Sequence, residues 1–303
     1  MPPVLWTGNL SLLTALLVNA SNALAFVTGG ARDTAAMKRR IRAGYETEFT
    51  DDIANYDEVG REHYRYIAEL LLSPLSLREA TVAEIGCGTG ILSEMLLERG
   101  VARVACSDIA GYMLNKCRER LTASAASEQR VDFAIADAEA LPYRDAEFDA
   151  ALSSMVFAFL PHQDRALREM GRIVRRGGQV AVAAHGRSFY HEAIEAAFRA
   201  VPKRYVIGYR VEFWPRGERA IKRALQRAGL TQVETKRVTW VETHPSPIDA
   251  YRFFSGTGGT WWLSKFPDPA TREALSQSVR DYFERKGITG ITQDVVLAYG
   301  VRR

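Results

Sequence analysis

Cysteine is scarce in this sequence, and the few thiols are poorly placed for a structural role. Three cysteines occur in 303 residues, at Cys87, Cys106 and Cys117. Their odd number argues against a disulfide framework, and the lack of C-x-x-C spacing argues against a zinc site. We therefore expect reduced thiols and no bound metal.

An excess of charge of one sign is also lacking. Forty Lys and Arg residues against 36 Asp and Glu residues leave a formal net charge of +4. So small an excess does not by itself hold nucleic acid electrostatically. Internal repeats and low-complexity segments are absent, and an apolar content of 47% is enough for one substantial core and a cap. The composition indicates a compact globular protein, and we expect no nucleic-acid partner.

Long hydrophobic runs are missing too. Residues 1–31 carry no charged side chain, but Asn9 and Asn19 interrupt the apolar stretch, which makes it a poor membrane span. Peripheral membrane association stays open. Ala23-Leu24-Ala25 matches the small-x-small pattern of a signal peptide, although no basic segment precedes it. Residues 1–36 are therefore either an extension of a cytoplasmic protein whose natural start is near Met37, or a segment whose residues 1–25 direct the chain to an organelle or for secretion.

The most informative feature is a glycine-rich turn between an apolar stretch and an expected helix. The residues at 82–85 predict a buried strand, Gly86, Gly88 and Gly90 alternate in the turn, and residues 91–97 open a helix. Glycine adopts positive φ and lets a ligand approach the backbone, so this turn is typical of a nucleotide site. The third glycine comes one residue too early for the dinucleotide fingerprint, which disfavours a pyrophosphate.

Polar residues also end the next expected strands. The second apolar stretch ends at Asp108, where a carboxylate can accept hydrogen bonds from both hydroxyls of a ribose. The third ends at Asp137, and the fourth, Phe148–Ser154, ends in two serines. Ligands of an open parallel sheet bind at the carboxyl ends of its strands. We therefore expect an adenosine moiety to bind along this edge.

From about Tyr45 to Gly186 the chain resembles the class I S-adenosylmethionine-dependent methyltransferases, in particular the small-molecule branch that includes ubiquinone and menaquinone biosynthesis enzymes. The resemblance rests on ordered motifs, which are Glu84–Gly90, Asp108-Ile109 with Met113, Asp137–Pro142, Phe148-Asp149 and Gly171–Gly178. Further signatures of the quinone enzymes are missing after the fourth strand, so their substrate is not implied.

The resemblance implies an α/β fold with a Rossmann-like seven-stranded sheet, mostly parallel with an antiparallel last strand, and helices on both faces. Residues 37–303 would form this methyltransferase domain. Insertions at about 202–215 and 245–287 would add a cap or lid.

The resemblance also implies S-adenosylmethionine (SAM) as the cofactor, with its methionine end at the glycine turn. Asp108 would bind the ribose and Asp137 the adenine amine. Tyr45 and Tyr56 would face the sulfonium, or they would simply pack a helix onto the sheet. The expected cofactor contacts are Tyr45, Tyr56, Glu84, Gly86, Cys87, Gly88, Gly90, Asp108, Ile109, Met113, Asp137, Ala138 and Ser153.

Two histidines are candidates for a catalytic base. Methyl transfer depends mainly on aligning two reactants in a water-poor pocket, but a phenol, carbon acid or amine acceptor also benefits from a base. His185 follows the fifth expected strand and His162 follows the fourth. A histidine base would give a rate that rises at about pH 6 to 7. A histidine at a strand end that only caps a turn is the alternative.

The segment 245–287 contains several aromatic side chains beside Gly256–Gly259, which suits a lid over an apolar or planar acceptor. The expected acceptor contacts are His191, Tyr251, Trp261 and Trp262, with ordinary packing as the alternative for the tryptophans. Basic residues between Lys203 and Arg223 are expected to spread around a solvated helix.

We therefore predict a SAM-dependent methyltransferase that acts on a small acceptor, with C-, O- and N-methylation all open. A SAM-binding module without catalysis and an RNA or protein methyltransferase are the alternatives. Ser153-Ser154-Met155-Val156 stands where enzymes that methylate amino groups of nucleic-acid bases carry an Asn/Asp-Pro-Pro-aromatic motif, which argues against that activity.

Overall fold

The computed structural model describes residues 34–48, 50–122, 129–200, 217–259, 263 and 268–303, together with Leu16 and Ala20. The chain divides into two compact units. The cap expected at 202–215 and both tryptophans of the expected lid, Trp261 and Trp262, lie outside the described residues. Unit 1 consists of Met1–Gly60, Arg187–Pro215 and Val238–Asp294, and unit 2 consists of Arg61–Gly186, Arg216–Arg237 and Val295–Arg303.

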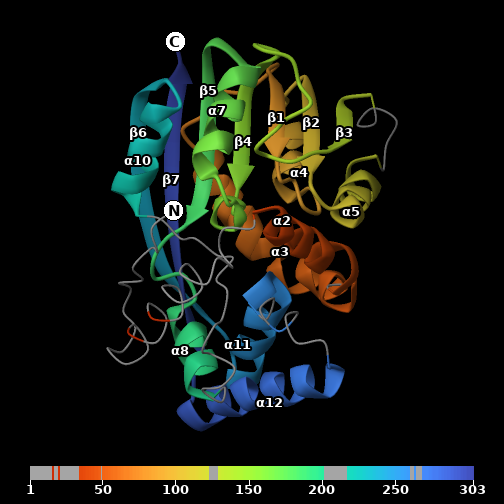
Figure 1. The fold of residues 1–303 in the computed structure, drawn as a ribbon, viewed down its shortest axis with the longest axis vertical. Coiled ribbons are helices and arrows are strands. Elements are labelled where there is room, and N and C mark those ends of the chain that lie inside the picture. Colours follow the sequence, from red (N-terminus) through yellow and green to blue (C-terminus); the bar gives the residue numbers. More distant parts are fainter. Residues whose placement is uncertain are drawn as a thin grey trace. The chain divides into compact units, whose positions relative to one another are not determined.

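Seven strands of the described residues form one sheet in the order β3-β2-β1-β4-β5-β7-β6 (Figure 1). The strands from β1 to β5 pair in parallel, and β7 pairs with β5 in the antiparallel direction. This arrangement confirms the predicted sheet, mostly parallel with an antiparallel last strand. The strands are β1 Thr81–Ile85, β2 Arg103–Asp108, β3 Val131–Ile135, β4 Phe148–Ser154, β5 Val174–His185, β6 Leu230–Thr243 and β7 Gly290–Arg302.

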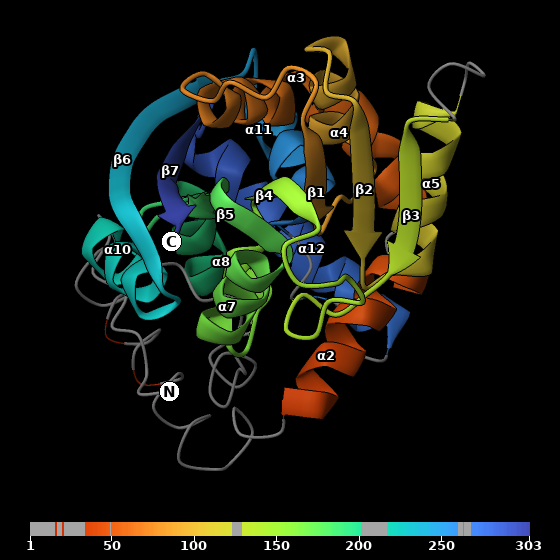
Figure 2. The same cartoon turned by 90° about the horizontal axis from the view of Figure 1, so that it is seen from above.

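Helices of unit 2 cover both faces of its part of the sheet, as Figure 2 shows. Side chains alternate between the two faces along each strand. Ala83 and Ile85 on β1 join a core cluster with Met170 and Leu225, whereas the intervening Glu84 faces the other side. The helices on the first face are α7 Gln163–Ile173 and α10 Glu218–Arg227, and those on the second are α4 Ile91–Glu98 and α5 Gly111–Leu121.

The fifth strand, which the sequence predicts over residues 179–184, is longer in the structure. It begins at Val174, because Val174 pairs with Phe148 before the register shifts and regular pairing resumes between Gln179 and Ala150. A Cβ at Gly178 would lie 2.4 Å from the carbonyl oxygen of Asp149, so only glycine fits this close strand contact.

Unit 1 is mainly helical and has an aromatic core. Tyr251, Phe253 and Phe254 from α11 are buried, and Phe254 stacks on Phe283 from α12. Helix α12 begins at Pro269, where the Asp268 side chain accepts hydrogen bonds from two backbone N–H groups. The helices described in unit 1 are α2 Thr34–Ala43, the π-helical turn η1 Gly44–Glu48, the first part of α3 Thr50–Leu72, α8 His191–Ala200, α11 Pro247–Phe254, the π-helical turn η3 Ser255–Gly259 and α12 Pro269–Lys286.

Helix α2 crosses the boundary expected between residues 1–36 and the methyltransferase domain. It begins at Thr34, and Met37 on it is only 2% exposed. A boundary at Met37 would therefore cut the helix after its first three residues. No helix among the described residues combines the length and the apolar character that a bilayer crossing requires.

Candidate active site

The glycine turn follows β1 and is held in place by the neighbouring strand. The backbone N–H groups of Gly86 and Cys87 both donate to the carbonyl of Ser107, at 2.7 and 2.9 Å. Gly86, Gly88 and Gly90 all have positive φ, of 74°, 53° and 87°. A Cβ built on Gly88 would meet no described atom within 4 Å, so this residue leaves room for a ligand to approach the backbone.

Asp108 lies at the end of β2 and binds this turn directly. Its carboxylate accepts a hydrogen bond from Gly88 N–H at 2.9 Å and another from Ala110 N–H at 3.0 Å. Burial raises the pKa of this carboxyl, and the hydrogen bonds from the backbone oppose that rise. Each carboxylate oxygen has a second lone pair, so the half-buried group can still accept from two ribose hydroxyls.

The loop after β3 brings Asp137 to the same edge. Its carboxylate accepts from Glu139 N–H at 2.9 Å, and Ala138 beside it is buried. The Glu139 carboxylate in turn accepts from His162 N–H at 2.8 Å at the start of α7. The loop that carries the expected adenine contact is thus fixed to the N-terminus of that helix.

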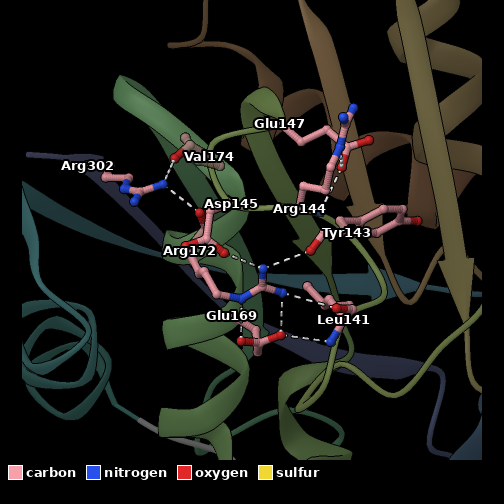
Figure 3. A network of polar contacts seen from close by, with 9 residues as sticks. All are labelled: Leu141, Tyr143, Arg144, Asp145, Glu147, Glu169, Arg172, Val174 and Arg302. Carbon is pink, nitrogen blue, oxygen red and sulfur yellow. Dashed lines mark hydrogen bonds and ion pairs between the residues drawn. The ribbon is translucent and has the colours of Figure 1, made fainter.

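Arg172 fixes the other end of the loop (Figure 3). Its guanidinium donates to the carbonyl of Tyr143 at 2.8 Å and to that of Leu141 at 3.1 Å. It also pairs with Glu169 at 2.8 Å, and the same carboxylate accepts from Leu141 N–H. These hydrogen bonds raise the pKa of the guanidinium and lower that of the Glu169 carboxyl. The loop is therefore clamped to both ends of α7.

Two expected cofactor contacts face the interior of unit 2. Glu84 is 2% exposed and accepts a hydrogen bond from Ser93 on α4, and burial raises the pKa of its carboxyl well above the usual range. The hydroxyl of Ser153 is buried and donates to the carbonyl of Ile85 at 2.8 Å, which links β4 to β1. Both side chains stabilise the sheet beneath the turn in this arrangement, and their contact with the cofactor stays a prediction.

The remaining cofactor candidates of unit 2 surround Asp108 and the turn. Ile109 directly follows Asp108 and is half-buried, while Met113 lies buried on α5. The thiol of Cys87 is buried as well, and it is free, like those of Cys106 and Cys117.

His185 lies at the end of β5 and is buried among apolar groups. It is 6% exposed, and its ring meets Phe159 edge to face, with the ring centroids 5.8 Å apart. Burial lowers the pKa of His185 to about 3, and the nearby His63 contributes to the shift. A buried neutral imidazole does not titrate between pH 6 and 7, so His185 itself would not produce the rise in rate expected there.

His63 was not expected at the site. It lies on α3, it is 4% exposed, and its electrostatic influence on His185 places the two rings near each other. Its position could have been found from helix spacing, because His63, Ile67 and Leu71 share one buried stripe of α3. A polar residue on such a stripe is a candidate for a site.

The other predicted site residues are distributed among several elements. His162 precedes α7 and is half-buried. In unit 1, His191 begins α8 with its Nε2 atom 3.3 Å from the Glu192 carboxylate, and Tyr45 and Tyr56 are half-buried on η1 and α3. Tyr251, expected at the acceptor, is 8% exposed, and its hydroxyl is hydrogen-bonded to Ser276. Its ring also meets Phe283, so it belongs to the packing between α11 and α12.

Comparison with known proteins agrees with this geometry. A methyltransferase domain family matches residues 83–182. The malonyl-[acyl-carrier protein] O-methyltransferase of Geobacter sulfurreducens is 31% identical over 273 residues, which cover 87% of this chain and 98% of that protein.

Solved structures show the same fold. The YcgJ protein of Bacillus subtilis gives a TM-score of 0.55 at 17% identity, covering 78% of this chain and 98% of that one. A phosphoethanolamine N-methyltransferase of Haemonchus contortus, solved with S-adenosylhomocysteine, gives a TM-score of 0.56 at 16% identity, covering 86% of this chain and 60% of that one. The open turn at Gly88 and the carboxylates at 108 and 137 lie at the edge where we expect the adenosine part of the cofactor to bind. The chain belongs to the class I SAM-dependent methyltransferases, and SAM is its cofactor.

Proposed function

We propose that this methyltransferase acts on a carboxylate oxygen, at the free end of a malonyl-type group that a carrier protein holds as a thioester. The resemblance to the Geobacter protein supports the acceptor class, because it covers 87% of this chain and extends far beyond the matched domain at 83–182. The unmatched remainder is much shorter than unit 1, so the similarity includes residues of unit 1 as well as the cofactor-binding half.

The similarity to a malonyl-carrier O-methyltransferase is the observation that carries the choice of a carboxylate, and the burial of His185, which lowers its pKa to about 3, agrees with it. A phenol or an amine must lose a proton to react well, and an imidazole of such low basicity is a poor proton acceptor at neutral pH. A carboxylic acid, with a pKa of about 4, is already ionised at neutral pH and requires no base. A neutral imidazole can still donate a hydrogen bond to the carboxylate and orient it.

Three aromatic residues of unit 1 give no support to an apolar or planar acceptor. Tyr251, Phe253 and Phe254 were expected to line a lid, but they are buried in the core of unit 1. Burial in the core leaves these three rings unavailable to a planar ligand.

The reaction needs little from the protein beyond alignment. SAM supplies a methyl group bound to a positively charged sulfur, and the carboxylate oxygen forms its bond to this carbon as the carbon–sulfur bond breaks. Asp108 would hold the ribose, Asp137 the adenine amine, and Gly88 would let the cofactor lie close to the backbone. The products are the methyl ester and S-adenosylhomocysteine, and no proton is transferred.

The test is methyl transfer from labelled SAM to a malonyl-loaded carrier protein. We expect a methyl ester on the malonyl group, with a rate that changes little between about pH 6 and pH 8, because neither reacting group titrates there. Acetyl-loaded carrier protein is the matched control, since it has the same thioester without the free carboxylate. Transfer to phenols or amines, with none to the malonyl group, would disprove the proposed acceptor. Binding of SAM without transfer to any acceptor would favour the non-catalytic alternative.

A further inference from the structure

The outer faces of α7 and α10 together form a basic surface on unit 2. Exposed cations lie at Arg165 and Arg168 on α7 and at Arg219, Lys222 and Arg223 on α10. We propose that this surface docks an acidic carrier protein and so brings the acceptor to the enzyme. The inference rests on the proposed function, because it takes the acceptor to be carrier-borne.

Helix geometry places the cations of α10 on one side. Residues 219, 222 and 223 are three and four positions apart, which is the spacing of neighbours on a helix surface. Ile221, Ala224 and Leu225 form the buried side. The expected spread of these basic residues around the helix is therefore wrong for α10, since its exposed cations share one face.

The two helices form one continuous surface. They pack against each other, and their buried residues belong to the same core cluster. Arg227 on α10 pairs with Asp164 on α7 at 3.0 Å, which links the two helices at the surface. Figure 2 shows both helices on the same side of the sheet.

The five cations of this surface have no carboxylate partner among the described residues, and they are gathered on two adjacent helices. Among the described residues, no ion pair or side-chain hydrogen bond is formed by Arg165, Arg168, Arg219, Lys222 or Arg223. In contrast, Arg61 pairs with Glu94 at 2.9 Å and Arg99 with Glu69 at 2.6 Å. Unpaired cations on adjacent helices create a positive potential that attracts and orients an acidic partner.

The surface begins next to the cofactor-binding edge. Helix α7 follows the carboxyl end of β4, and the N–H of His162 at its start is bound by Glu139 in the Asp137 loop. Arg165 lies one helical turn further on, and Arg168 one turn beyond it. A protein docked on these helices could extend a flexible thioester arm toward the edge where Asp108 and Asp137 lie.

Several features favour an acidic protein over nucleic acid as the partner. Surfaces that bind single strands combine cations with aromatic side chains on which bases stack. The sequences of α7 and α10 contain no aromatic residue. The half-buried carboxylates of Asp164 and Glu218 lie among the cations and would repel a phosphate backbone, whereas a protein can place basic groups opposite them.

The decisive experiment compares two forms of the same acceptor. The wild-type chain and the variant Arg219→Glu/Lys222→Glu/Arg223→Glu are assayed with malonyl-loaded carrier protein and with a small malonyl thioester that lacks the protein. We expect KM for the carrier-borne acceptor to rise about tenfold or more in the variant, with kcat and the KM for the small thioester unchanged. Added salt should raise the wild-type KM for the carrier-borne acceptor only.

Two further variants guard against a misfolded protein. Arg165→Glu/Arg168→Glu alters the α7 side of the surface and should raise the same KM. Arg78→Glu/Arg144→Glu/Arg176→Glu reverses three exposed charges outside the two helices and should leave it unchanged. An equal loss of activity with both acceptors, or an equal rise in KM in this control variant, would overturn the docking surface.

The docking surface and the proposed function can fail separately. If the enzyme methylates both malonyl acceptors equally well, without salt dependence, the function stands and the surface does not. If no malonyl acceptor is methylated, the docking surface can still be tested by titrating labelled, unloaded carrier protein. Equal affinity of the wild type and the variant for this carrier protein would then disprove the docking surface. The docking surface would also be disproved if the wild-type protein bound a single-stranded RNA oligomer more tightly than it bound the carrier protein.

Discussion

The carboxylate of Asp108 accepts a hydrogen bond from the backbone N–H of Gly88 at 2.9 Å. The residue expected to bind the ribose is therefore also a support for the glycine turn on the neighbouring strand. One side chain would then perform both tasks, so we expect a change at Asp108 to alter the shape of the turn as well as the number of hydrogen bonds to the cofactor.

Replacing Asp108 by Ala should weaken the binding of SAM and of S-adenosylhomocysteine by about 1.5–3 kcal/mol, as expected for charged hydrogen bonds. It should also lower the melting temperature, since the N–H groups of Gly88 and Ala110 lose their acceptor. Calorimetry and thermal melting measure the two effects. Asp132→Ala is the matched control, because it removes a carboxylate from the next strand, β3, where its ion pair among the described residues is with Arg103 at the surface. Wild-type affinity in Asp108→Ala would refute the ribose assignment.

The burial of His185 predicts a loss of stability in mild acid. Its pKa is about 3 in the folded protein and about 6.5 in the unfolded chain. Between these values the unfolded chain binds a proton that the folded protein does not, so stability is complete above about pH 6.5 and falls as the pH decreases toward 3. The loss from this group between pH 7 and pH 5 is about 2 kcal/mol.

The measurement is the free energy of unfolding in urea at the two pH values, for wild type and His185→Gln. Glutamine does not titrate, so the variant should lose less stability on acidification than the wild type. Identical losses in both proteins would mean that His185 is not held neutral by burial.

The parts of the candidate site that could be predicted from the sequence are those whose conformation depends on residues nearby in the chain. The glycine turn and Asp108 could be identified because backbone conformation and position at a strand end are determined by neighbours in the chain. Glu84 was expected at the ligand and lies in the interior, because both faces of β1 are buried and its apolar run has no alternation to show which way a side chain points.

Other parts depend on contacts between distant residues. His63 and His185 are 122 positions apart, and their proximity follows from how α3 covers the sheet, which no local pattern records. Tyr251 was assigned to a lid from its aromatic neighbours, yet the same composition is needed to build the core between α11 and α12. Aromatic clusters alone do not distinguish a pocket from a core.

Gly86 and Val156 provide a test of the turn itself. A Cβ on Gly86 would lie 2.4 Å from a methyl carbon of Val156, and its φ of 74° is unfavourable for any other residue. Gly86→Ala should therefore lower the melting temperature clearly, and adding Val156→Ala should restore part of the loss because it removes the clash. Gly88→Ala is the control, since its Cβ meets no described atom within 4 Å. If Val156→Ala gives no rescue, the close contact between the two residues is wrong.

Arg172 should control recognition of adenine without touching it. Its guanidinium holds the carbonyls of Leu141 and Tyr143, and through them the loop that carries Asp137. Arg172→Ala frees this loop, so the cofactor should lose the hydrogen bond from its adenine amine to Asp137. Arg172→Lys should keep only part of the wild-type recognition of adenine, because a single ammonium cannot reproduce the planar guanidinium that binds two carbonyls and Glu169 together.

A loss of affinity alone would not separate this positioning role from general destabilisation, so the test compares two ligands. S-adenosylhomocysteine has the adenine amine, and its inosine analogue has a carbonyl oxygen there instead. Wild type should prefer the adenine form by about tenfold, the value of one good hydrogen bond, and Arg172→Ala should reduce this preference to near one. Arg144→Ala, which removes a 90% exposed arginine from the same loop, should keep it. A preference that survives in Arg172→Ala, even with a lower melting temperature, would show that Arg172 only stabilises the fold.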